Sequence, residues 1–174
     1  KQLSQNYLKF RNTCKFCLDN LVGFDADHLV QPDEMLPLDK WAVTRLNTLI
    51  EKVFAAYDNY EFHVVSHMVN DFCVVDLSSF YFDIIKDRLY CGEENSLERR
   101  SAQSAVWMIL DAMTRLFAPI LAFTCDEVWL AMPHRAGDDA RNVLLNQMVQ
   151  PYAAYALSEE EMGKWARLAA LRTA

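Results

Sequence analysis

Turn-forming residues are scarce in this chain: only four of its 174 residues are glycine and five are proline. An all-β sandwich needs many tight turns, so this scarcity argues against that class. No apolar run reaches about 18 residues, the length that a transmembrane helix requires, and we expect no membrane association. The opening residues, KQLSQN, lack the apolar stretch of a secretion signal. An initiator methionine is also absent, so we expect a cut or processed chain.

The cysteines do not form the regular, even-numbered set of a disulfide framework. They are Cys14, Cys17, Cys73, Cys91 and Cys125. An odd, scattered set of this kind is typical of reduced thiols, and we expect a cytoplasmic protein.

Neither the cysteines nor the histidines have the spacing of a complete metal site. Cys14 and Cys17 form a lone C-x-x-C pair, whereas a structural zinc site needs four ligands. His63 and His67 share a helix face, but no glutamate stands between them as in H-E-x-x-H. We therefore predict core packing for the two cysteines and no metal ligand among these residues.

Signatures of nucleotide-binding and hydrolytic sites are missing as well. The sequence contains neither G-x-x-x-x-G-K-[ST] nor G-x-G-x-x-G. Ser78 and Ser79 lie outside any G-x-S-x-G turn, so nothing marks them as nucleophiles. The residues alone predict a binding or structural module without catalytic machinery.

Helical periodicity dominates the chain, and 52% hydrophobic content can fill a sizeable core. Apolar residues spaced three and four apart predict a first helix that buries Leu3, Tyr7, Phe10, Cys14, Cys17 and Leu21. We expect further helices over about 39–58, 62–75, 97–117, 124–129 and 158–172. Residues 76–89 form either a separate helix or a kinked continuation, and 143–145 form a short strand. Antiparallel helices with short loops predict an all-α helix bundle.

Polar residues at expected helix starts suggest where several helices begin. Asp39 is a suitable N-cap for the second helix, and Asp76 or Ser78 could cap a new turn. Thr124–Glu127 and Ser158–Glu161 both have the spacing of a capping box.

The net charge of −7 opposes binding to a polyanion, but the charges are unevenly distributed. The first 18 residues contain four basic residues and no acidic one. Tyr7, Arg11 and Lys15 are four apart, so they share one ridge of the first helix. A ring beside two cations suits RNA, although Tyr7 could instead be a core residue that the cations merely flank. A second basic group, interspersed with acidic residues, consists of Lys86, Arg88, Arg99 and Arg100.

Several sequence blocks resemble the anticodon-binding domain of bacterial-type isoleucyl-tRNA synthetases, which are class I enzymes. The most specific blocks are NYEFH, DLSSFY and KDRLY within residues 57–90. Other blocks match in the expected order: FRNTCKFCLDNL, LDKWAVTRL, RRSAQ, RLFAPILAFTCDEVW and KWARLAALR. Valyl-, leucyl- and methionyl-tRNA synthetases share the fold, and the DLSSFY block points to the isoleucine enzyme among them.

The resemblance implies an anticodon-binding helical bundle over residues 1–133 and the truncated start of a C-terminal junction region over 134–174. It implies a parent enzyme that joins isoleucine to its tRNA using ATP and Mg²⁺ and that carries zinc in a C-terminal module. The family's ATP-site signatures, His-Ile-Gly-His and Lys-Met-Ser-Lys-Ser, do not occur here. We therefore expect this chain to be non-catalytic and without a cofactor of its own. Its expected partners are tRNA and the remaining synthetase domains, and we expect a monomer.

The resemblance also suggests individual RNA-binding residues. In the related methionyl enzymes, an asparagine and an arginine one turn apart on the first helix help to read anticodon bases. Tyr7 and Arg11 occupy the matching places, and only Arg11 keeps the residue type. Those enzymes also use an aromatic residue before the fourth helix, for which Tyr90 is the nearest candidate. The full expected set is Tyr7, Arg11, Lys15, Lys86, Arg88, Tyr90, Arg99 and Arg100.

An alternative interpretation remains open at this point. The chain could be a helical scaffold that packs on the rest of its enzyme and leaves RNA contact to other domains. The net charge of −7 favours this alternative for the isolated chain.

Overall fold

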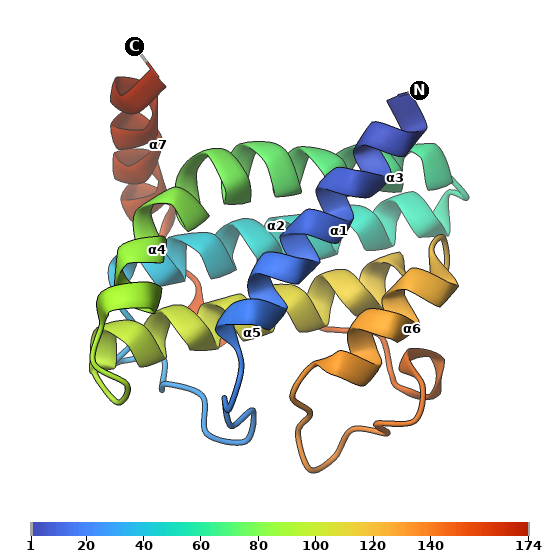
Figure 1. The fold of residues 1–174 in the computed structure, drawn as a ribbon. Helices are drawn as coiled ribbons and strands as arrows, with labels where there is room; N and C mark the ends of the chain where they lie inside the picture. The colour runs from blue at the N-terminus through green and yellow to red at the C-terminus, as the bar shows by residue number, and fades with distance from the viewer. Residues whose placement is uncertain (1, 174) are drawn as a thin grey trace.

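The computed structural model describes residues 2–173, which form a helix bundle (Figure 1). The elements in chain order are α1 (Gln2–Asn20), α2 (Pro37–Asp58), α3 (Phe62–Asp71), the π-helix η1 (Phe72–Tyr81), α4 (Phe82–Cys91), α5 (Leu97–Phe117), α6 (Ala122–Ala131), the short 3₁₀ helices η2 (Val143–Leu145) and η3 (Ala153–Tyr155), and α7 (Glu159–Thr173). The described part of the chain contains no strand, which confirms the predicted all-α class. None of its helices has both the length and the apolar character needed to cross a membrane.

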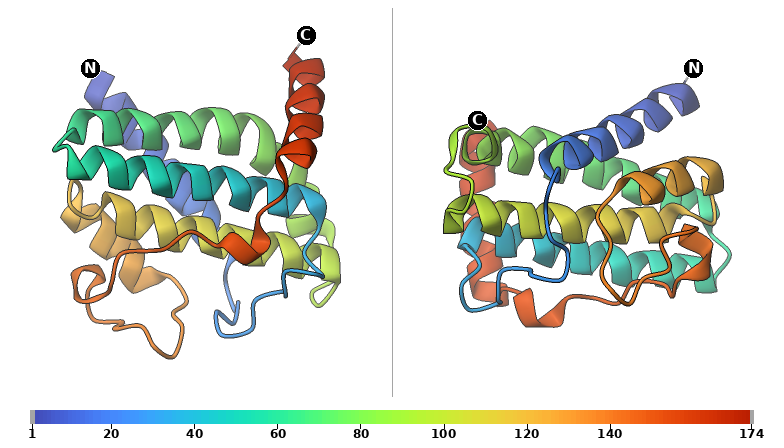
Figure 2. Two further views of the ribbon diagram at one scale, coloured as in Figure 1. Left: turned by 180° about the vertical axis from the view of Figure 1, so that it is seen from behind. Right: turned by 60° about the horizontal axis from the view of Figure 1, so that its bottom comes forward.

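The helix α5 forms the centre of the bundle, because every residue from 101 to 117 is buried. Helix α2 lies along one side of α5, and the rod formed by α3, η1 and α4 lies on the far side of α2 (Figure 1). Helix α1 crosses diagonally over this layer, with α6 beside it. Two further views show that α7 lies at the end of the bundle opposite the start of α1 (Figure 2), where Met162, Trp165 and Ala169 pack against the core.

The apolar stripe of α1 is buried as predicted over most of its length. Phe10, Cys14 and Cys17 are each at most 2% exposed, and Phe10 packs edge-to-face on Phe117 with ring centroids 4.9 Å apart. The prediction was wrong for Leu3, which is 83% exposed. The first turns of α1 extend beyond the neighbouring helices, so nothing covers the stripe there (Figure 1).

Residues 62–91 form one continuous rod, which resolves the choice between a separate and a continued helix. The chain passes from α3 through the π-helix η1 into α4 without a new cap. Ser78 Oγ donates to the carbonyl of Cys73 at 2.8 Å, and Ser79 Oγ donates to that of Val74 at 2.7 Å. Asp76 instead accepts two hydrogen bonds from Arg45, at 3.1 and 3.0 Å. The proposed caps at Asp76 and Ser78 were therefore wrong.

The expected N-cap Asp39 is instead a fully buried residue in the first turn of α2. The helix begins two residues earlier, at Pro37, whose fixed φ suits the first helical position. The Asp39 carboxylate accepts hydrogen bonds from Tyr81 Oη (2.7 Å), Ser101 Oγ (2.6 Å) and Arg88 Nη1 (3.1 Å). One side chain thus joins α2 to η1, α4 and α5.

Two other local predictions were wrong and one was confirmed. Helix α6 starts at Ala122, so Thr124 and Glu127 lie inside it and form no capping box. Residues 143–145 form a 3₁₀ turn rather than a strand, because Asn142 Oδ1 accepts from the backbone N–H of Leu144 at 2.8 Å. The Ser158–Glu161 capping box is confirmed by reciprocal bonds of 2.9 and 3.3 Å.

The segment after α6 is held on the bundle by a second buried carboxylate, Asp111. Its side chain is 0% exposed and pairs with Arg115 at 2.8 Å. Arg115 also bonds Asp138 at 2.8 Å, and Tyr152 Oη bonds Asp111 at 3.3 Å. Val143 is buried in the same core. The predicted division at residues 133 and 134 stays a prediction.

Burial of Asp39 makes the stability of the fold depend on pH. Desolvation raises the pKa of this carboxyl above 3.8, although Ser101, Arg88 and Tyr81 oppose the shift. The native state therefore holds a proton at pH values where the unfolded chain has lost it, and Asp39 contributes less stability as pH rises through this window. We expect the unfolding free energy of the wild type, minus that of an Asp39→Asn variant, to fall as pH increases from 3.8. Urea unfolding at several pH values measures this difference, and a rise would contradict the assignment.

Candidate nucleic-acid interface

The ridge predicted on α1 exists, but its three residues have different environments. Tyr7 is half-buried, and its hydroxyl lies 3.3 Å from Thr124 Oγ1 on α6. Arg11 is exposed, and the described part of the chain offers its guanidinium no hydrogen bond or ion pair. Lys15 is exposed and pairs with Asp19 on the same helix at 2.6 Å. Arg11 is therefore the ridge residue whose donors remain available to a ligand.

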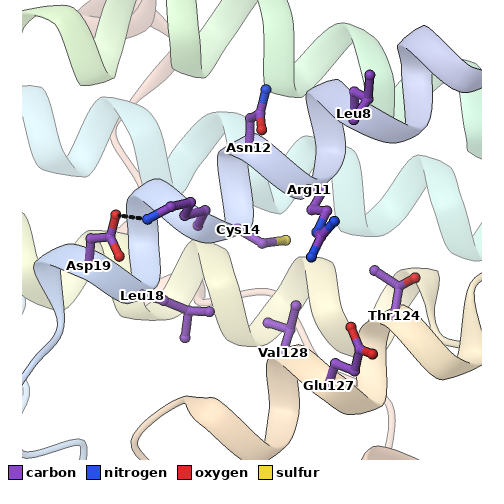
Figure 3. Close-up of a pocket in the computed structure, with 10 residues that line it drawn as sticks. Leu8, Arg11, Asn12, Cys14, Leu18, Asp19, Thr124, Glu127 and Val128 are labelled. Carbon is purple, nitrogen blue, oxygen red and sulfur yellow. Dashed lines mark hydrogen bonds and ion pairs between the residues drawn. The ribbon is translucent and has the colours of Figure 1, made fainter.

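A groove of about 440 Å³ separates this ridge from α6 (Figure 3). Its apolar lining includes Cys14, Leu18 and Val128. Arg11 points into it from α1, and Glu127 points into it from α6 (Figure 3). The groove thus combines apolar side chains with one cationic and one anionic side chain at its walls.

A second, shallower groove lies on the other side of α1, where η1 and α4 pass beneath it. Phe16 and Phe82 stack there with ring centroids 4.2 Å apart. Asn12 and Lys86 line this groove from opposite walls, and Lys86 pairs with Asp83 at 2.6 Å. Lys86 therefore lies close to the α1 ridge, although the two were far apart in sequence.

The remaining basic residues of the second group have partners within the fold. Arg88 donates to the buried Asp39, and only 24% of its side chain is exposed. Arg99 donates to the carbonyl of Gly92 at 3.2 Å. Arg100 donates to the carbonyl of His28 at 2.9 Å and lies over the ring of Phe24. The structure thus places Lys86 beside the ridge and Arg99 and Arg100 near the start of α5.

Tyr90 ends up in an accessible position near the end of α4. Its side chain is 64% exposed, as an aromatic residue that stacks on an unpaired base would need to be. It lies one turn beyond Lys86 on the same helix, so the two can act on one ligand.

Cys14, Cys17, Cys73 and Cys125 are buried as free thiols. Burial raises the pKa of Cys73 and Cys125 to about 12 and raises that of Cys14 and Cys17 well above the ordinary value. Thiolates, which metals require, are therefore disfavoured. Within residues 2–173, no group of three or more histidine, cysteine, aspartate or glutamate residues is placed to hold a metal ion. Metal-independent folding stays a prediction.

A protein-family comparison decides between the possible classes of helix bundle. The family described as "Anticodon-binding domain of tRNA ligase" matches residues 39–171. This chain belongs to that family. The matched range covers most of α2 to α7 and does not include α1.

The relatives of this anticodon-binding domain are bacterial isoleucine–tRNA ligases. That of Syntrophotalea carbinolica is 46% identical over 151 residues, which is 86% of this chain and 16% of the ligase. That of Moorella thermoacetica is 44% identical over 174 residues, 99% of this chain and 18% of the ligase. That of Symbiobacterium thermophilum is 44% identical over 175 residues, with 100% and 18% coverage. The domain thus spans less than a fifth of the length of these relatives.

Sequence analysis missed three residues that line the groove beside Arg11: Asn12, Thr124 and Glu127. Thr124 and Glu127 carried a usable signal, because residues three apart share a helix face. The same spacing is typical of a capping box, which hides the alternative that both side chains face a ligand.

Arg88 and Lys86 provide a test of which basic residues serve the fold. Arg88→Ala leaves the buried Asp39 carboxylate without its cation, so we expect it to lower the unfolding free energy by about 3 kcal/mol. Lys86→Ala removes an exposed ion pair and should cost less than about 1 kcal/mol. Urea denaturation of both variants measures the difference. Equal losses would show that Arg88 is not a structural residue.

Proposed function

We propose that this chain binds the anticodon arm of an isoleucine tRNA as one domain of an isoleucine–tRNA ligase. The observation that carries the proposal is the guanidinium of Arg11, which has no partner among residues 2–173 and lies beside an open groove, on a domain of the anticodon-binding family. The ligase names of its relatives supply the amino acid. Unpaired RNA bases are recognised by stacking and by hydrogen bonds to their edges, and this face offers both.

In this proposal, the exposure of each residue determines its role. Arg11 and Lys15 contact the phosphate backbone or base edges from α1. Tyr7 presents one face of its ring, and Lys86 with Tyr90 extends the surface along α4. Arg88, Arg99 and Arg100 act mainly by holding the surrounding structure, and their exposed parts add positive potential near the RNA.

The chemistry of aminoacylation takes place in other parts of the proposed ligase. ATP and Mg²⁺ would bind there, as would zinc, and this chain would contribute only affinity and specificity for the tRNA. It would act in the cytoplasm, in contact with the other domains of the same synthetase.

A scaffold role with little RNA contact is the competing function. Its support is electrostatic, because the net charge is −7 and both Lys15 and Lys86 already have carboxylate partners. The two functions differ in what Arg11→Ala should change.

For RNA binding, we expect Arg11→Ala to weaken binding of an isoleucine-tRNA anticodon hairpin by about 1–3 kcal/mol. Binding by the wild type should be weak and should fall steeply with added salt, because phosphate contacts release counterions. The variant should keep the wild-type melting temperature, since Arg11 has no partner in the described structure. Fluorescence anisotropy and thermal unfolding provide the two measurements.

Lys52→Ala is the matched control, because Lys52 is exposed on α2, away from α1. It should bind the hairpin like the wild type. A lower melting temperature with unchanged hairpin affinity for Arg11→Ala would favour the scaffold role. Equal affinity for anticodon hairpins of unrelated tRNAs would remove the isoleucine assignment while leaving RNA binding intact.

We also expect the chain alone to show no isoleucine-dependent exchange of pyrophosphate into ATP. That reaction needs an ATP site, and the sequence has none of the family's signatures for one. Exchange above the level of a protein-free control, abolished by heat denaturation of the chain, would refute this expectation.

A further inference from the structure

Helices α1 and α6 face each other at two consecutive turns, and the residue pairs at these two turns differ in whether their side chains meet. At the first level, Tyr7 of α1 and Thr124 of α6 meet with 3.3 Å between their hydroxyl oxygens. At the next level, one turn along each helix, Arg11 and Glu127 point toward each other across the groove (Figure 3). No ion pair within 4.0 Å joins them, and neither has another partner in the described part of the chain.

Arg11 and Glu127 carry opposite charges and could close the gap between them, yet they form no ion pair. An exposed ion pair contributes only about 0–1 kcal/mol, so a ligand could enter between the two groups without a large penalty. The base of the groove is apolar at Leu18 and Val128. The gap between Arg11 and Glu127 is therefore open to an apolar group with polar edges.

Glu127 restricts what that group can be. A carboxylate only accepts hydrogen bonds when ionised, and it repels phosphate. Arg11 only donates. The ligand must therefore present acceptors to one wall and donors to the other, which a nucleobase can do and a phosphate cannot.

Among the four RNA bases, guanine best meets both requirements. Its O6 and N7 atoms accept a bidentate arginine. Its N1–H and N2 amino group lie on the adjacent edge and can both donate to one carboxylate. Adenine and cytosine offer a carboxylate a single amino group, and uracil offers only one ring N–H.

We propose that the gap between Arg11 and Glu127 holds one unpaired guanine, with Glu127 as the residue that determines specificity. This inference rests on the proposed binding of RNA to the α1 face and adds a base and a residue to it. Arg11 supplies affinity through O6 and N7, and Glu127 selects the base through the N1–H and the N2 amino group.

The test uses this chain and RNA hairpins whose loops contain uridines and one variable base. Guanine, inosine and 7-deazaguanine occupy the variable position in turn. Inosine lacks the N2 amino group that faces Glu127, and 7-deazaguanine lacks the N7 acceptor that faces Arg11. We expect each analogue to bind about tenfold more weakly than guanine, since one lost contact of this kind corresponds to about that factor.

Two variants assign each effect to its residue. Glu127→Gln replaces one of the two acceptor oxygens with a donor, so it should reduce the preference for guanine over inosine and keep the preference over 7-deazaguanine. Arg11→Ala should do the reverse. Glu51→Gln serves as the control, because Glu51 is an exposed glutamate on α2, and it should keep both preferences.

The outcomes separate this inference from the proposed function. Equal binding of all loop bases, weakened throughout by Arg11→Ala and Lys15→Ala, would overturn the guanine site and leave RNA binding standing. An undiminished preference for guanine over inosine in Glu127→Gln would likewise overturn the role of Glu127. Failure of every hairpin to bind at low ionic strength would overturn both proposals.

Discussion

The arrangement of the bundle depends on one carboxylate that has no contact with water. Asp39 accepts hydrogen bonds from three elements, through Tyr81 of η1, Arg88 of α4 and Ser101 of α5. A buried charge without partners is strongly unfavourable, so only a chain arrangement that brings all three donors to α2 is tolerated. Ser101 also accepts from the backbone N–H of Leu36, so the loop before α2 is fixed by the same cluster. Apolar packing alone would allow the rod to slide along α2, and this network sets its register.

The partners of the cations within the fold also explain how a domain with a net charge of −7 can keep a cation available to a ligand. Arg88 and Arg115 are held by buried carboxylates, and Arg100 is held by a loop carbonyl. Arg88 and Arg115 neutralise carboxylates inside the molecule and contribute less to an approaching polyanion than a cation without a partner does. The net charge therefore says less about RNA binding than the partners of each cation do, and Arg11 is one of the cations that have no partner in the described structure.

Helices were predictable from the sequence because their apolar residues repeat at a spacing that only a helix buries. The long helices α1, α2 and α5 follow this pattern and were found with errors of about two residues at their ends. The roles of polar residues were harder to predict, because Asp39 and Thr124 are residue types that often cap helices and lie near expected helix starts. Whether an aspartate caps a helix or enters the core depends on distant residues such as Tyr81 and Ser101, and a local pattern contains no information about them. The site shows the same limit: the α1 ridge was visible in the sequence, whereas its opposite wall on α6 required the tertiary structure.

The π-helix η1 determines the direction in which the residues after it point, and no single side chain reveals this effect. Each residue of an α-helix turns the following residues by about 100°. If Phe72–Tyr81 tightened into α-helix with no residue removed, each residue would turn the chain further than it does in the wider π-helix, and everything after the segment would rotate. Arg88 would then turn away from Asp39, and Lys86 would leave the wall that it forms opposite Asn12. The turn per residue between the start of this rod and its end therefore determines the contacts of the rod as much as the identity of its residues does.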